Sequence, residues 1–132
     1  MTDLNNADIQ ALLAQPNFAV ISTNNADGST HSTVVWFDTV DDKVAVNSAV
    51  GRKWPTNLER DPQTTIVVID KDNPYFFVEI RGNASGTTDG ADAHIDRLAK
   101  KYLGQDEYPY RQPGERRITY TIEPEHVRLV KQ

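Results

Sequence analysis

The sequence predicts a mainly β protein with two or three helices, in which the strands form a closed or nearly closed antiparallel barrel. About six or seven short segments alternate apolar and polar residues or are rich in β-branched residues, as strands are. Most turns between these segments are short, which favours antiparallel pairing. A closed barrel leaves no strand edge exposed, so this architecture suits a chain with many strands and few helices.

Strands are predicted over residues 18–23, 30–38, 43–48, 64–70, 75–87, 116–123 and 126–131. The pair Asp27-Gly28 favours a tight hairpin between the first two. The run 64–70 is apolar enough to be buried on both faces. Gly82 and Gly86 predict a bulge or a barrel corner in the fifth strand.

Helices are predicted over residues 6–15, over the segment that follows Gly51 and stops at Asp61-Pro62, and over residues 91–103. Asn5 or Asn6 can cap the first helix, and Pro16 ends it. In the third helix, apolar residues three or four apart form one stripe, and Gly104 is placed to end it.

Composition predicts a single domain over residues 1–132. Hydrophobic residues make up 38% and charged residues 25%, as in an ordinary soluble protein. No run reaches the roughly 18 apolar residues of a membrane helix, and the opening residues lack the pattern of a secretion signal. The chain has no cysteine, which excludes disulfides and cysteine-ligated metals. A cytoplasmic location is expected.

The net charge is −5, from 14 basic and 19 acidic residues. A nucleic-acid-binding protein is expected to carry a surplus of cations, so no nucleic-acid partner is predicted. A local basic site in an acidic protein indicates a small anionic ligand instead.

The turn Gly51-Arg52-Lys53 is the first candidate site. It stands at the entrance of the second predicted helix, where unpaired backbone N–H groups favour an anion such as phosphate. Arg52 can add a two-pronged contact and Lys53 a point charge. The alternative is that the two cations merely solubilise a turn.

The strand from Thr30 to Trp36 is the second candidate. A flat heteroaromatic ligand needs main-chain donors and acceptors at its edge and apolar side chains against its face, and this strand offers both. The alternative is that Val34, Trp36 and Phe37 belong to the core or to an interface.

Three further features of the sequence bear on the site. Tyr108, Tyr110 and Arg111 lie in a proline-bearing loop that is either the wall of a pocket or a packed surface loop. The pair Arg116-Arg117 begins a strand, where cations often protect an edge. His94 is expected at the surface of its helix or at an interface, and no histidine has metal-ligand spacing, so no metal is predicted.

Several segments together resemble the flavin and deazaflavin oxidoreductases of the split β-barrel superfamily, typified by pyridoxamine-phosphate oxidase. The similarity is greatest to the F420-dependent reductase family of actinobacteria, in its B-type branch. The segments that carry it are residues 27–36, 47–62, 70–75, 79–82, 93–98, 102–104 and 108–109.

This resemblance implies an FMN-binding, PNPOx-like split barrel and a homodimer with cofactor sites between its subunits. The cofactor-binding residues that it implies are Ser32, Thr33, Val34, Val35, Trp36, Asn47, Ser48, Arg52, Lys53, Asn57, Pro74 and Tyr75. Arg52 and Lys53 would hold the phosphate, and the strand would lie along the ring. Pro74-Tyr75 and the loop 108–111 would form the other wall, from the partner subunit. Tyr108, Tyr110 and Arg111 would contact the substrate.

The implied function is an F420H2-dependent reductase that passes hydride from the reduced deazaflavin coenzyme F420 to an unsaturated or conjugated-carbonyl acceptor. No catalytic side chain is assigned. Thr33 and Trp36 stand where pyridoxamine-phosphate oxidases carry basic residues, which argues against vitamin B6 oxidation. The alternatives are an FMN-binding oxidase or reductase of the same fold and a non-catalytic cofactor-binding protein.

Overall fold

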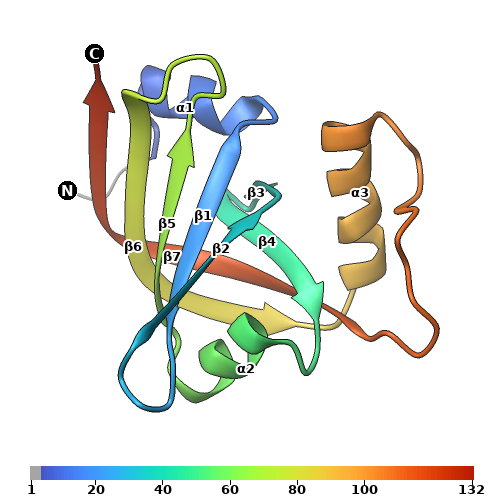
Figure 1. The fold of residues 1–132 in the computed structure, drawn as a ribbon. Coiled ribbons are helices and arrows are strands. Elements are labelled where there is room, and N and C mark those ends of the chain that lie inside the picture. Colours follow the sequence, from blue (N-terminus) through green and yellow to red (C-terminus); the bar gives the residue numbers. More distant parts are fainter. Residues whose placement is uncertain (1–3) are drawn as a thin grey trace.

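One antiparallel sheet of seven strands and three helices make up residues 4–132, the part of the chain that the computed structural model describes (Figure 1). The strands are β1 (Phe18–Asn24), β2 (Thr30–Val35), β3 (Phe37–Val40), β4 (Lys43–Ala49), β5 (Gln63–Ile69), β6 (Phe76–Thr87) and β7 (Arg117–Lys131). The helices are α1 (Ala7–Ala14), α2 (Lys53–Arg60) and α3 (Ala91–Leu103). The predicted mainly β, antiparallel class is confirmed. Residues 1–3, which open the stretch examined for a secretion signal, lie outside the described residues.

The two ends of the sheet meet at Trp36. The strand order is β2-β1-β5-β6-β7-β4-β3, so β2 and β3 lie at opposite ends of the sheet. One residue, Trp36, separates them in the chain, and the sheet therefore has to curl until its ends approach. The barrel is closed there by the covalent chain, because no ladder joins β2 to β3 among the described strands. The predicted single strand over 30–38 is wrong for this reason: its two parts pair with different ends of the sheet.

β6 and β7 form the longest ladder, and both curve strongly (Figure 1). Their register shifts between Arg81 and Gly82, where a Cβ on the glycine would lie 1.9 Å from the carbonyl oxygen of Glu123. The predicted bulge is confirmed at Gly82, whereas Gly86 lies in the regular part of the ladder, opposite Tyr120. The two C-terminal strands predicted around Pro124 are one strand, because the proline sits opposite Gly82 at the irregularity, where a missing N–H donor is tolerated.

The core lies on the concave side of the sheet. Fully buried side chains alternate along the strands, as in Ile66 and Val68 of β5. Burial of each such side chain contributes about 1.5–3 kcal/mol. The prediction that 64–70 is buried on both faces is wrong, since Val67 and Ile69 lie half-exposed on the outer face.

The helices lie around the barrel: α1 covers its top in the view of Figure 1, α2 lies at its bottom, and α3 stands to the right of the sheet. The predicted stripe of α3 is confirmed, with Ile95, Leu98 and Ala99 buried. Gly104 ends the helix in the left-handed conformation at φ 72°, as predicted. No helix within residues 4–132 is long and apolar enough to cross a membrane.

Candidate functional site

A cavity of about 470 Å³ opens between β2, the start of α2, α3 and the loop that follows α3. Its volume falls in the range of small-molecule and cofactor sites. The residues that line it are His31, Thr33, Val34, Val35, Trp36, Asn47, Ser48, Arg52, Lys53, Trp54, Ile95, Leu98, Tyr108, Tyr110 and Arg117.

The cavity meets β2 along its edge. Consecutive residues of a strand point to opposite faces, yet Thr33, Val34 and Val35 all line the cavity. β2 is also an edge strand of the sheet and pairs with β1 alone. Alternate residues of β2 therefore present N–H and C=O groups away from β1, which can bind the polar edge of a flat ring.

Aromatic side chains form one wall of the cavity. The Trp36 ring stacks on Tyr102, with centroids 5.3 Å apart and an interplanar angle of 6°. Tyr108 meets Trp36 edge-on at 6.0 Å, and Tyr110 meets Tyr108 edge-on at 5.7 Å. Burial raises the pKa of Tyr102, and its hydroxyl donates to the carbonyl of Asn17 at 2.8 Å. The stacked Tyr102 and the edge-on Tyr108 hold the plane of the Trp36 ring.

Cations gather at the opposite end. Gly51 adopts φ 97°, and α2 starts directly afterwards without a side-chain cap, so backbone N–H groups of Lys53 and Trp54 remain free of intrahelical partners. Arg52 and Lys53 line the cavity beside this helix end. The helix dipole and both cations favour an anionic group here.

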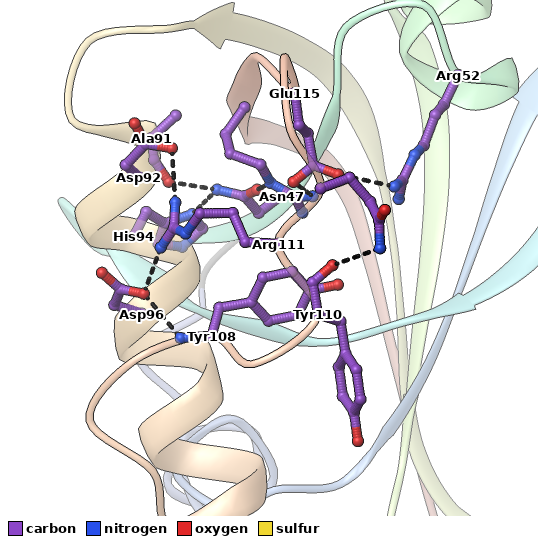
Figure 2. Close-up of polar contacts among 12 residues, drawn as sticks. Asn47, Arg52, Ala91, Asp92, His94, Asp96, Tyr108, Tyr110, Arg111 and Glu115 are labelled. Carbon is purple, nitrogen blue, oxygen red and sulfur yellow. Dashed lines mark hydrogen bonds and ion pairs between the residues drawn. The ribbon is translucent and has the colours of Figure 1, made fainter.

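A third cation, Arg117, is buried in the cavity wall, with 3% of its side chain exposed. Its Nε donates to Asn47 Oδ1 at 2.9 Å and its Nη1 to Glu115 Oε1 at 2.8 Å. The other oxygen of Glu115 accepts from Arg52 Nη2 at 3.0 Å (Figure 2). The Arg117 guanidinium also lies 5.2 Å from the centre of the Tyr108 ring. The expectation that the Arg116-Arg117 pair protects an edge is wrong for Arg117.

His94 is buried within its own chain, with 2% of its surface exposed, so the prediction of a surface or interface position is wrong. It lies on the inward stripe of α3, one turn before Leu98. Its Nε2 donates to Asp38 at 2.7 Å, while Nδ1 lies 3.1 Å from Asn47 Nδ2. Because Arg117 Nε can only donate, Asn47 turns its oxygen to Arg117 and its NH₂ to His94, whose Nδ1 accepts.

Asp38, His94, Asn47, Arg117 and Glu115 thus form one connected chain of hydrogen bonds behind the cavity. The chain joins β3, α3, β4 and β7. It leaves the Asn47 amide fully engaged, so Asn47 lines the cavity chiefly as a support for Arg117.

Some predicted residues lie outside the cavity. Ser32 points to the other face of β2 and shares a 2.8 Å hydrogen bond with Ser22. Asn57 is buried and donates to Thr23 at 3.0 Å and to Asn25 at 2.9 Å. Asn57 therefore ties α2 to the β1–β2 hairpin and supports the cationic turn from behind.

Arg111 pairs with Asp92 at 3.0 Å and with Asp96 at 2.7 Å (Figure 2). These ion pairs hold the loop after α3 against the helix and thereby place Tyr108 and Tyr110 in the wall. Pro74-Tyr75 form the turn before β6, and Tyr75 is 66% exposed away from the cavity of its own chain.

Sequence reasoning missed Trp54, Ile95, Leu98 and Arg117 as lining residues, and it included His31 only as part of the candidate strand. Alternation along β7 carried a signal for Arg117, because Arg117 and Thr119 share the face opposite to the core residues Tyr120 and Ile122. Within residues 4–132, no group of three or more His, Asp or Glu side chains is arranged to hold a metal ion.

The fold is a split β-barrel, and its cavity combines the open edge of β2, an aromatic wall and three cationic side chains. The chain belongs to the pyridoxamine 5′-phosphate oxidase family, whose model matches residues 6–131. The family includes oxidoreductases and binds flavin-type cofactors such as FMN or F420. The predicted superfamily is confirmed.

Solved structures agree on the fold. An F420 reductase is 24% identical, with a TM-score of 0.78, covering 90% of this chain and 94% of that one. A conserved hypothetical protein of Mycobacterium tuberculosis is 18% identical, with a TM-score of 0.76 and coverages of 98% and 86%. A putative pyridoxamine 5′-phosphate oxidase of Listeria innocua is 20% identical, with a TM-score of 0.71 and coverages of 92% and 94%. No curated protein sequence matches the chain significantly.

Proposed function

We propose that this protein is an F420H2-dependent reductase that transfers hydride from reduced deazaflavin F420 to an unsaturated or conjugated-carbonyl organic acceptor. The observation that carries the proposal is the cavity itself, which joins an open strand edge, an aromatic wall and a cationic end. The name of one similar structure, an F420 reductase, supports the choice of cofactor, although an identity of 24% reaches only the fold.

The lining residues fit a flat ring with a phosphorylated tail. Val34, Val35 and Trp36 would seat the ring, with its polar edge against the free main-chain groups of β2. Arg52 and Lys53 would hold the phosphate at the start of α2, with Ser48 beside the tail.

When bound, the deazaflavin supplies the hydride chemistry. The protein holds ring and acceptor in reacting geometry, excludes water with the aromatic wall, and stabilises negative charge on the acceptor. Tyr108 and Tyr110 would contact the acceptor, because they line the cavity beside the ring-binding strand. Solvent or the Tyr108 hydroxyl would supply the proton.

The outer face of the sheet supports a homodimer as part of this proposal. Val34, Val20 and Val67 stand opposite one another in adjacent strands β2, β1 and β5, and Phe18 nearby is 58% exposed. Val34, itself 68% exposed, also lines the cavity. A second copy seated on this face would cover the open side of the cavity and bring its own Tyr75 within reach.

The test is a parallel titration of the purified protein with F420 and with FMN, followed by fluorescence quenching. We expect F420 to bind more tightly, and the reduced form to be consumed when an α,β-unsaturated ketone or lactone is added. Tight FMN binding with no F420 binding would support the FMN-dependent alternative on the same fold. Saturable binding with no turnover of any acceptor would leave a cofactor-binding protein.

A further inference from the structure

Glu115 lies between two of the three cavity cations. One carboxylate oxygen accepts from the buried Arg117 at 2.8 Å, and the other from Arg52 at 3.0 Å (Figure 2). The side chains of Glu115 and Arg117 are 5% and 3% exposed, whereas that of Arg52 is 52% exposed. One carboxylate is thus shared by a buried and a half-exposed guanidinium.

The two ion pairs of Glu115 differ in how easily each can be broken. Arg117 needs a negative partner because its charge is buried, and Glu115 is the carboxylate paired with it among the described residues. Arg52 reaches solvent and can exchange Glu115 for a ligand anion at little cost. The Arg52 half of the bridge is therefore the half that a ligand can replace.

Arg117 also keeps one donor group for the cavity. Its Nε and Nη1 are engaged, and Nη2 has no hydrogen bond within residues 4–132. No buried side-chain nitrogen or oxygen in that range lacks a partner, so Nη2 has to reach the cavity. The anionic end of a ligand consequently meets three positive side chains and, directly behind them, one negative one.

We propose that Glu115 determines which phosphorylated tail the cavity prefers, favouring a phosphodiester with one negative charge over a phosphomonoester with two. The inference rests on the proposed function and concerns the tail of the same cofactor. Repulsion by a fixed carboxylate grows in proportion to the charge of the ligand, and burial of Glu115 weakens screening by salt. Deazaflavin F420 carries a phosphodiester, whereas FMN ends in a phosphomonoester.

Three flavins with one ring test this directly: riboflavin, riboflavin 4′,5′-cyclic phosphate and FMN carry no, one and two negative charges at pH 7.5. Glu115→Gln removes the charge but keeps an acceptor for Arg117. Asp106→Asn is the matched control, because Asp106 lies in the same loop with 89% of its side chain exposed. Dissociation constants come from quenching of flavin fluorescence in 0.1 M salt, alongside F420.

In Glu115→Gln we expect unchanged riboflavin affinity, about threefold tighter binding of the cyclic phosphate and about tenfold tighter binding of FMN. Raising the salt to 0.5 M should shrink these differences, and Asp106→Asn should change none of them. Glu115→Ala removes the acceptor together with the charge and should give the same ranking. All titrations are made at a temperature at which melting curves show each variant to be folded.

An equal change for all three flavins would show that Glu115 only supports the fold and would overturn the inference. F420 binding to the wild type with FMN binding to neither protein would overturn it as well. If neither F420 nor any flavin binds the wild type, the proposed function itself fails, and the inference fails with it.

Discussion

The substitution Lys53→Ala should weaken binding of the cofactor phosphate and leave the stability of the fold almost unchanged. Lys53 lines the cavity at the first position of α2, and its side chain makes no hydrogen bond or ion pair with another residue in the range 4–132. Its removal should therefore leave the free energy of unfolding within about 0.5 kcal/mol of the wild type. A charge-assisted hydrogen bond to phosphate contributes about 1.5–3 kcal/mol, and exposure of the lysine favours the lower end. The expected loss of F420 affinity is about tenfold.

The assay is a fluorescence titration of F420 with the wild type, Lys53→Ala and Lys100→Ala. Lys100 is the matched control: it lies on α3 with 64% of its side chain exposed, pairs with Asp106 and does not line the cavity. Thermal melting of all three proteins accompanies the titration. Unchanged affinity in Lys53→Ala, with normal melting, would remove Lys53 from the site and refute the assignment of the α2 entrance to the phosphate.

Three other perturbations follow from the structure. Burial lowers the pKa of Lys101 from 10.5 to about 8, so between these values the unfolded chain binds more protons and stability rises with pH. The rise should be about 1 kcal/mol after allowance for partial exposure, and chemical denaturation from pH 7 to 11 should show it flattened in Lys101→Met. Gly82→Ala should lower the unfolding free energy by more than about 2 kcal/mol in urea, because its Cβ would overlap the Glu123 carbonyl; a wild-type midpoint would contradict the bulge geometry. Asn47→Leu should cost about 3 kcal/mol or more by the same assay and weaken binding of anionic ligands, since the Arg117 Nε would lose its acceptor; intact affinity would show that Arg117 needs no such support.

Features set by neighbouring residues could be predicted from the sequence. Gly104 ended α3 where its position beyond an apolar stripe indicated, and Gly82 marked the bulge. Both depend on backbone conformations that one residue type permits, so a local pattern is enough to locate them.

Features set by distant residues could not be predicted in this way. The partners of His94 are Asp38 and Asn47, far away in the sequence, and an inward-facing histidine at helical spacing has no local mark that separates it from a surface one. The break at Trp36 has a similar origin. The residues on either side of it favour strand equally, and only pairing with opposite ends of the sheet separates β2 from β3.

The same break explains why the ring-binding strand and the phosphate-binding turn meet. Closure at Trp36 brings β2, at one end of the sheet, close to β3, at the other end. β4 pairs with β3 and leads directly into the turn at Gly51. A fully paired barrel would satisfy the outer edge of β2 and leave no main-chain groups for a ligand. The split therefore supplies the binding edge. A proline at Val34 or Val35 removes one backbone N–H donor of β2. At the position whose N–H faces the cavity it should weaken ring binding, and at the position whose N–H faces β1 it should disturb the ladder between the two strands. Riboflavin titration and thermal melting of the two variants would distinguish the positions, and two variants alike in both measurements would contradict an edge-on site.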